Sequence, residues 1–342
     1  MTAVGYVAKP VSRNVLVRAV EHALLAPSVH NTQPWKWRVR ADAVELYADL
    51  DRHLVGTDPD RRDLVISCGA ALHHLRVVLA AAGVAVAVAR LPDPEDSTLL
   101  AVVHIVADGR IDEQAAALAG AIGDRRSDRR AFAPEPAHPA QLRLLTACAA
   151  AENVRLVAVV GDEARARLAV VLGEAARRER ATPGYAAELA LWSGRYANSR
   201  DGLPTLSRTA RGSASQGLGL RHFPVGGLQQ SPQTLTGGPD GATLMVATTT
   251  GDEVRDWLRA GEATSAALLV ATRIGLATTV LSQSVEVADT RRQLADVVLR
   301  VPENAQLVLR VGRAPDGAAP LPPVPRRPLR AVLISTNDRN ES

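Results

Sequence analysis

The order of predicted helices and strands occurs twice along the chain, and this repetition constrains the fold more than any other feature. The first half starts with a helix over 13–26, where apolar residues recur at helical spacing, and Pro27 ends it because the residue before a proline avoids the α region. The patterns that follow predict strands within 35–48, a helix over 58–82, strands over 84–89 and 99–107, and a helix over 112–122.

The second half repeats this order. Its patterns predict a helix over 139–151, a strand over 154–160, helices over 162–180 and 252–274, and strands over 277–281 and 306–311. The segment 72–86 resembles 268–281, since each is a helix that ends in Ala-Gly-Val or Ile-Gly-Leu before a strand. Similarity of this kind indicates duplication of one unit, although alanine-rich helices also resemble one another without a common origin.

Length and composition indicate a globular protein made of two halves or one large α/β unit. The 342 residues exceed one ordinary domain, and 46% of them are hydrophobic, which is enough for a core. The formal net charge is +4, but Lys9 and Lys36 are the only lysines, and the arginines are scattered among acidic residues. Because aromatic residues make up only 3%, the sequence lacks the stacking rings and clustered cations of a nucleic-acid surface.

Other segments argue against a secreted, membrane or metal-binding protein. Cys68 and Cys148 have neither metal-type nor redox-type spacing, which fits a reducing, cytoplasmic location. Residues 1–10 lack the apolar stretch of a secretory signal, and the longest nearly uncharged apolar run, 77–89, is too short to span a bilayer. The adjacent His73 and His74 point to different sides of a helix, so they predict no metal site.

The stretch 199–241 contains nine glycines and four prolines and has no periodicity. Compact domains carry such a long structureless stretch when it is a lid, a binding loop or disorder. Its apolar residues, among them Leu203, Leu218 and Phe223, favour a lid, because a solvated linker would not need them. A flexible insertion is the alternative.

The loop after the first helix, 26–35, carries the most informative polar residues. Its sequence is Ala-Pro-Ser-Val-His-Asn-Thr-Gln-Pro-Trp, in which Asn31 and Gln33 offer amide donors and acceptors beside the hydroxyl of Ser28. These groups suit a planar heterocycle with carbonyl and N–H edges. A plain helix-to-strand turn has the same composition and is the alternative.

Two arginine-rich segments are candidates for binding an anion. The first is Arg125-Arg126-Ser127-Asp128-Arg129-Arg130-Ala131-Phe132, whose guanidinium groups can bind phosphate oxygens bidentately. The second, Arg326-Arg327-Pro328-Leu329, would add a second arm. The alternatives are a solvated charged linker for the first segment and a basic tail for the second.

Together these segments resemble known motifs. The order Ala-Pro-Ser-x-x-Asn-x-Gln-Pro-Trp over 26–35 resembles the FMN loop of the nitroreductase superfamily. Arg125-Arg126-Ser127 followed by Phe132 resembles that family's phosphate motif, and 326–329 resembles its C-terminal basic motif. The presence of both halves in one chain resembles the Acg-type branch of mycobacteria and actinomycetes.

The resemblance implies an α+β fold with two nitroreductase-like halves that form a pseudo-dimer within one chain. Each half would be a mixed sheet flanked by helices. The first half would span 1–122 and carry the FMN loop, and the second would span 123–330, with the phosphate motifs and a lid insertion at 199–241, before a C-terminal tail over 331–342. A pseudo-dimeric monomer is therefore expected.

The resemblance also implies one composite FMN site. In the family, one subunit supplies the phosphate arginines and its partner supplies the Pro-Ser-x-x-Asn loop. The start of the first half, Lys9-Pro10-Val11-Ser12-Arg13, lacks the arginine motif, and the loop near 149–153 lacks the Pro-Ser-x-x-Asn pattern. One site is therefore complete and the other has lost both sides.

The residues expected at this site come from four segments. Pro27, Ser28 and Asn31 are expected to touch the flavin ring or ribityl chain, and Arg125 and Ser127 to hold the phosphate. Further candidates for cofactor binding are His30, Gln33, Arg126, Arg129, Ser282, Gln283, Arg326 and Arg327. Two questions stay open: whether His30 contacts the ring or caps the loop, and whether Arg129 or Arg130 meets the phosphate.

The implied activity is electron transfer from NADH or NADPH through FMN to a nitro, quinone or similar small-molecule acceptor. FMN supplies the redox chemistry, so no catalytic side chain and no metal are expected. The alternative is a catalytically silent protein that binds FMN and sequesters it beneath the lid.

Overall fold

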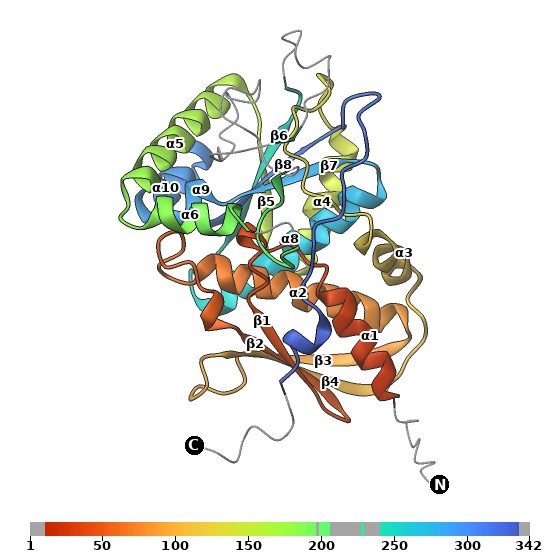
Figure 1. Ribbon diagram of the computed structural model, residues 1–342. Helices are drawn as coiled ribbons and strands as arrows, with labels where there is room; N and C mark the ends of the chain where they lie inside the picture. Colours follow the sequence, from red (N-terminus) through yellow and green to blue (C-terminus); the bar gives the residue numbers. More distant parts are fainter. Residues whose placement is uncertain (1–10, 196–197, 206–226, 229–239, 335–342) are drawn as a thin grey trace, which may run out of the picture.

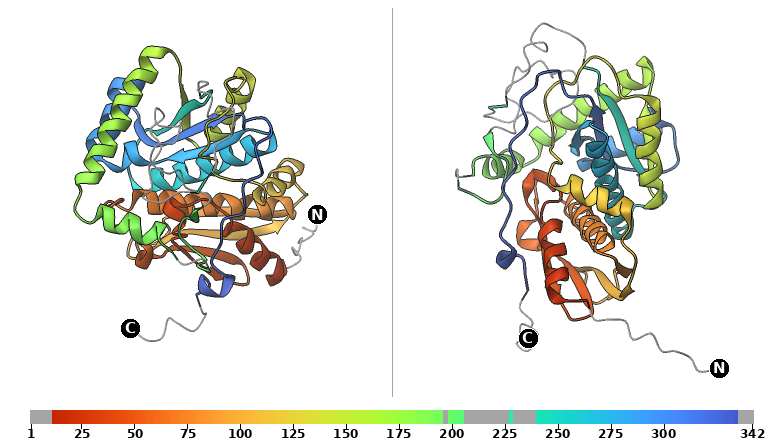
Figure 2. Two further views of the ribbon diagram at one scale, coloured as in Figure 1. Left: turned by 45° about the horizontal axis from the view of Figure 1, so that its top comes forward. Right: turned by 90° about the vertical axis from the view of Figure 1, so that its right-hand side faces the viewer.

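The protein consists of two four-stranded sheets with two long helices between them (Figure 1). The structure is a computed structural model, and it describes residues 11–195, 198–205, 227–228 and 240–334. Both further views also show these two helices side by side between the sheets (Figure 2). Helices and antiparallel sheets together make an α+β fold.

The first sheet has the order β1-β2-β4-β3 and lies at the bottom of Figure 1. Its strands are β1 (Trp35–Val39), β2 (Ala43–Ala48), β3 (Val84–Arg90) and β4 (Leu99–Asp108). Trp37 pairs with Leu46 and Val44 with Val103, so alternate side chains of neighbouring strands meet on one face. That face and α1 (Arg13–Ala23) enclose a core in which Trp35 and Trp37 are fully buried.

The second sheet has the corresponding order, β5-β6-β8-β7. Its strands are β5 (Arg155–Val159), β6 (Thr243–Thr249), β7 (Ala277–Leu281) and β8 (Asn304–Gly312). All named strand pairs in both sheets are antiparallel, so the expectation of mixed sheets is wrong. The error arises because the strands joined by the long helices are separated in each sheet by a strand of opposite direction.

A short C-terminal segment pairs with strand β1 in the parallel direction. Leu333 forms an isolated parallel bridge with Trp37, whose N–H donates to the Val332 carbonyl at 2.7 Å. Val332 is buried in the first core. Residues 331–334, assigned by the sequence to a tail, therefore pack against the edge of the first sheet.

The two halves meet where α2 (Arg62–Ala81) crosses α8 (Val254–Arg273). A Cβ at Gly69 would lie 2.0 Å from the Leu258 carbonyl oxygen, and one at Gly261 would lie 2.0 Å from the Ile66 carbonyl oxygen. Only glycine allows the two backbones to approach this closely. This crossing fixes how the first half lies against the second.

Among the described residues, α2 is the one helix whose length and hydropathy would allow it to cross a membrane. However, 78% of its most apolar window is buried inside the protein. It packs against α1, α3 (Glu113–Ile122) and α8. Packing within the core therefore accounts for its apolar character.

The remaining helices flank the second sheet. They are α4 (Pro139–Ala151), α5 (Asp162–Ala181), α6 (Tyr185–Ser193), α9 (Gln283–Glu286) and α10 (Ala288–Gln293), followed by a π-helical turn at Leu294–Leu299. The sequence patterns predicted α4 and α5 but not the helices after β7. Of the predicted lid, 206–226 and 229–239 lie outside the described residues, whereas 199–205 is described.

The crossing of α2 and α8 can be tested with Gly261→Ala. The added methyl group would meet the Ile66 carbonyl, so the free energy of unfolding should fall by about 1–3 kcal/mol in a denaturant titration. Gly173→Ala in α5 is the matched control, because its methyl group meets nothing within 4 Å and alanine is the better helix former. Equal stability of the two variants would contradict the close crossing.

Candidate functional site

Two adjoining cavities lie between the two halves. Counted with the space at their mouths, they measure about 840 and 670 Å³. We call them the wide cavity and the arginine cavity. Five residues line both of them, so they form one continuous site: Pro27, Ser28, Ser127, Arg129 and Leu203.

The structure brings most of the predicted residues to this site. Eleven of the thirteen line one or both cavities: Pro27, Ser28, His30, Asn31, Arg125, Arg126, Ser127, Arg129, Ser282, Gln283 and Arg326. Gln33 and Arg327 line neither cavity. Arg327 donates from its backbone N–H to Gln33 Oε1 at 2.7 Å and from Nη1 to the Gln33 carbonyl at 3.0 Å, so this pair braces the loop from behind.

The loop at 28–33 has an unusual backbone. His30, Asn31 and Gln33 have φ values of 45°, 56° and 52°, in the left-handed region that non-glycine residues rarely adopt. The Ser28 hydroxyl accepts a hydrogen bond from the Gln33 N–H at 2.9 Å, which closes the turn. Three such residues within four positions need support from their surroundings.

The side-chain amide of Asn31 provides part of that support. Its Nδ2 donates to the carbonyls of Gly202 at 3.0 Å and Pro325 at 3.1 Å, and its Oδ1 accepts from Arg326 Nη1 at 2.7 Å. Gln33 Nε2 also donates to the Arg200 carbonyl at 2.8 Å. These amides therefore join three segments that lie far apart in the sequence.

Three arginines gather in the arginine cavity without acidic partners. No carboxylate among the described residues pairs with Arg125, Arg126 or Arg326, and Arg125 Nε and Nη1 have no hydrogen-bond partner there. Burial, with a contribution from the Arg126 cation, lowers the pKa of Arg125 to about 10. Burial and the cations of Arg125 and Arg126 lower the pKa of Arg326 to about 9. Such a cluster is suited to bind an anion.

The adjacent Arg129 and Arg130 have different surroundings. Arg129 lines both cavities. Arg130 is buried and bound to the carboxylate of Asp128, with Nε and Nη2 contacts of 2.9 and 2.7 Å, and its Nη1 donates to the Ala319 carbonyl at 2.8 Å. Of the two, Arg129 is therefore the one placed to meet a bound anion.

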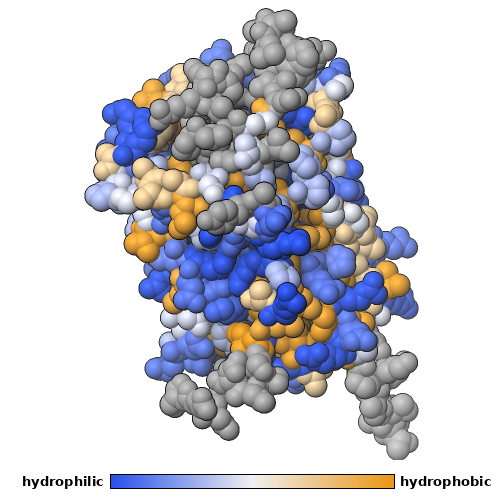
Figure 3. Space-filling view, viewed as in Figure 1, coloured by the Kyte–Doolittle hydropathy of each residue, from blue (hydrophilic) through white to orange (hydrophobic). Residues whose placement is uncertain are grey.

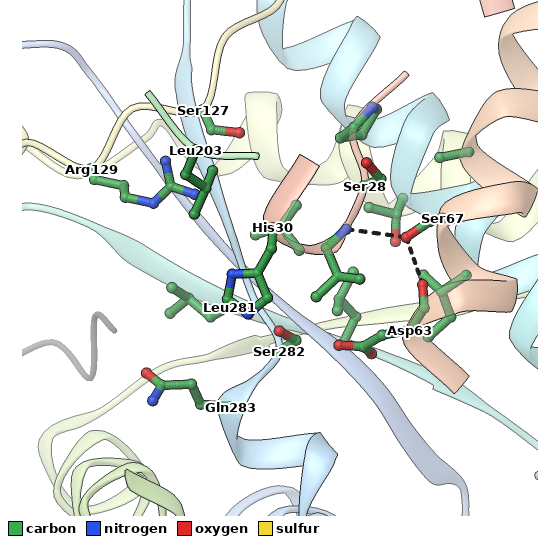
Figure 4. A pocket seen from close by; sticks show the side chains of 17 residues that line it. Ser28, His30, Asp63, Ser67, Ser127, Arg129, Leu203, Leu281, Ser282 and Gln283 are labelled. Carbon is green, nitrogen blue, oxygen red and sulfur yellow. Dashed lines mark hydrogen bonds between the residues drawn. The ribbon is translucent and has the colours of Figure 1, made fainter. Parts of the chain in front are cut away.

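The end of β7 forms another wall of the wide cavity. Ser282 donates from Oγ to Glu286 Oε1 at 2.6 Å, and Gln283 donates from Nε2 to Glu179 Oε2 at 2.7 Å. Both side chains are thus oriented by buried carboxylates of neighbouring helices. Figure 4 shows Ser282 and Leu281 below the imidazole of His30.

Residues of α2 and α8 that the sequence analysis did not select line the same cavity: Asp63, Ile66, Ser67, Ala70 and Thr264. Ser67 Oγ accepts from the Val29 N–H at 3.2 Å and donates to the Asp63 carbonyl at 2.6 Å (Figure 4). Asp63 and Ser67 lie one helical turn apart, which the sequence shows. The sequence does not show that this face of the helix contacts the loop, so it could not identify the two residues as part of the site.

The surroundings of the site add two facts. Hydrophilic side chains form a band across the middle of the face seen in Figure 3. Within the part of the chain that the structure describes, no group of three or more His, Cys, Asp or Glu residues is arranged to hold a metal ion.

Comparison with known proteins identifies the family. No protein-family model matches the sequence. Two Mycobacterium tuberculosis proteins, each named "Putative NAD(P)H nitroreductase", align over 323 residues. One, Rv3131, is 40% identical, with 94% of this chain and 90% of the relative covered. The other, acg, is 35% identical, with 94% and 96% covered. The chain therefore belongs to the nitroreductase family of these relatives.

A comparison of structures finds more distant similarity. The FMN-dependent nitroreductase NfnB from Mycobacterium smegmatis, solved in complex with NADPH, has 20% sequence identity and a TM-score of 0.40. The match covers 64% of this chain and 97% of that protein.

The bracing role of Asn31 predicts the behaviour of two variants. Asn31→Gly and Asn31→Ala both lose the amide contacts and should lower the free energy of unfolding by about 1–3 kcal/mol. Alanine should cost roughly a further 1 kcal/mol, because only glycine adopts a φ of 56° without strain. Thermal and denaturant unfolding measure both differences. Wild-type stability in the glycine variant would rule out the bracing role.

Proposed function

We propose that the chain binds one FMN across the two cavities and transfers electrons from NAD(P)H to a nitro, quinone or similar acceptor. The observation that carries this proposal is the cluster of the buried Arg125 with the half-buried Arg126 and Arg326, which have no acidic partner among the described residues, at one end of an otherwise mixed polar and apolar site. A phosphorylated, planar cofactor has the same distribution of charge: an anion at one end and a largely uncharged ring at the other.

The proposed placement assigns a role to each segment. Arg125, Ser127 and Arg129 would hold the phosphate, and Arg126 and Arg326 would contribute positive field. Pro27, Ser28, Ser282 and Gln283 would surround the ring in the wide cavity. Arg326 Nη1 and Nη2 already donate to Asn31 and to the Leu25 carbonyl, so its hydrogen bonds serve the loop. Asn31 and Gln33 would likewise position the loop instead of binding FMN through their amides.

The relatives support the redox partner. Their names specify NAD(P)H nitroreductases, and an FMN-dependent nitroreductase has been solved with NADPH. When bound, FMN supplies the chemistry of hydride and electron transfer, and the protein supplies binding, orientation and exclusion of water. The residues of this chain would thus act mainly by placing the cofactor.

A comparison of the two halves supports a pseudo-dimeric organisation. The sheets have the same strand order, and the alignment that pairs Gly69 with Gly261 also pairs Gly83 with Gly275, both with left-handed φ. The division into 1–122 and 123–330 places the loop in the first half and the arginine motif in the second. One chain would then supply both sides of one site.

The same alignment explains why there would be a single site. It pairs Ala70 of the wide cavity with Glu262, and Ser282 with Arg90. Glu262 is fully buried, and it binds Arg90 through contacts of 2.7 and 2.8 Å and Arg76 at 2.7 Å. Side chains of the protein therefore fill the space that corresponds to the wide cavity.

A second candidate function is sequestration of FMN without turnover, and the segment 198–205 favours it. Asn31 and Gln33 hold this segment through the carbonyls of Gly202 and Arg200, and Arg52 forms an ion pair with Asp201. Its Leu203 lines both cavities. A segment held so firmly beside both cavities would restrict access to FMN.

The two functions differ in a stopped-flow experiment. We expect the purified protein to be yellow, and its flavin absorbance to bleach on mixing with NADPH and to recover on addition of a quinone. A yellow protein that NADPH does not bleach would support sequestration. A colourless protein that does not bind added FMN would contradict both functions.

The phosphate site predicts the effect of Arg125→Ala. Loss of a charge-assisted contact should weaken FMN binding by roughly 1.5–3 kcal/mol in a fluorescence titration. Arg143→Ala removes the same charge from an exposed position on α4 and should leave FMN affinity unchanged. Equal affinities for the two variants would place the phosphate elsewhere.

The pseudo-dimer predicts one FMN per chain and, in light scattering, a particle with the mass of one chain. Reconstitution followed by absorbance at known protein concentration measures the first quantity. Two FMN per chain, or one FMN per two chains, would contradict the proposed composite site.

A further inference from the structure

The imidazole of His30 lies in the middle of the wide cavity. Figure 4 shows the ring pointing away from the loop, with Leu203 above it and Leu281 and Ser282 below. The residue is 7% exposed. Among the described residues that line the two cavities, it is the one histidine.

The backbone of the loop determines this placement. His30 has a φ of 45°, and its neighbours are fixed by hydrogen bonds on both sides: the Asn31 N–H donates to the Ser28 carbonyl at 3.0 Å, and the Val29 N–H donates to Ser67 Oγ at 3.2 Å. Strained residues that a surrounding structure holds in place occur preferentially at functional sites. The strained backbone at His30 therefore indicates that the imidazole has a function in the cavity.

The charged groups around the imidazole bear on which side chain can donate a proton in the cavity. Among the described residues, those facing it across the cavity are Arg129 and Asp63, and the carboxylates behind the β7 end are Glu286, bound to Ser282, and Glu179, bound to Gln283. Arginine keeps its proton, and the Ser282 proton points to Glu286. Asp63 lies in the first turn of α2, where the helix N-terminus stabilises an anion.

We propose that His30 is a catalytic proton donor to the electron acceptor. This inference rests on the proposed function and adds a residue to a reaction in which no acid was expected from the sequence. Imidazole is the side chain that ordinarily exchanges a proton near neutral pH. A histidine directed into the cavity where the acceptor would lie can supply the proton that the acceptor requires.

When the acceptor is a quinone, it would gain a hydride equivalent, which bound FMN would supply from the reduced nicotinamide dinucleotide, and one proton from the protonated imidazole of His30. The products are the hydroquinone and neutral imidazole, which takes a proton back from water. A one-electron acceptor such as ferricyanide gains an electron without a proton, so it does not need His30.

This difference between acceptors provides the test. FMN-loaded protein is reduced with NADPH, or with dithionite if NADPH does not react, and is mixed with benzoquinone or with ferricyanide in a stopped-flow instrument. His30→Gln should slow reoxidation by benzoquinone roughly 10²–10⁴-fold. Reoxidation by ferricyanide should slow far less, so the ratio of the two rates in each protein measures the contribution of the proton.

His30→Gly provides the matched rescue experiment. Glycine adopts the φ of His30 without strain, so this variant should fold and bind FMN. The removed ring leaves space for a small base, and added imidazole should restore the rate with benzoquinone. N-methylpyrrole, which has a similar shape but no exchangeable ring proton, should not.

A second readout does not depend on turnover. The midpoint potential of bound FMN should vary with pH differently in the wild type and in His30→Gln, because the variant lacks the imidazole that exchanges a proton. The proposal would be overturned if His30→Gln slows both acceptors equally, if it slows neither, or if wild-type reduced protein passes no electrons to benzoquinone. FMN binding by the wild type in any of these cases would leave the cofactor site of the proposed function intact.

Discussion

The close crossing of α2 and α8 is the constraint on which the site depends. Gly69 and Gly261 allow the two helix backbones to touch, and this contact sets the first half against the second. The loop after α1 and the arginines at 125–129 reach the same cavity only because of that arrangement. A larger residue at either glycine would push the two helices apart, and with them the loop and the arginines. The geometry of the site therefore depends on the packing of α2 against α8.

Charge is distributed unequally over the site. In the arginine cavity, the buried guanidinium group of Arg125 and the half-buried ones of Arg126 and Arg326 lack acidic partners among the described residues, an arrangement that a bound anion would stabilise. At the position that aligns with Ala70 of the wide cavity, Glu262 is instead paired with Arg76 and Arg90. The same fold thus contains one buried charge cluster that is satisfied internally and one that is left for a ligand.

The loop and the arginines of the site could be predicted from the sequence, whereas the strand directions and the cavity-lining residues of the helices could not. The loop and the arginine motif were recognisable because their residues are consecutive and their chemistry is specific. The strand directions were not, because they depend on which strand lies between β2 and β3 in the sheet. Arg130 could be distinguished from Arg129 only when Asp128 was seen to bind it. Asp63 and Thr264, which line the wide cavity, come from separate helices, and their proximity follows from the crossing of α2 and α8.

A comparison of FMN with riboflavin tests the central claim most directly. The two ligands share the ring and the ribityl chain and differ only in the phosphate that the arginine cavity is proposed to hold. In a titration of the apoprotein, FMN should bind at least about tenfold more tightly than riboflavin, and the difference should shrink in Arg125→Ala. Equal affinity of the wild-type chain for the two ligands would contradict the account.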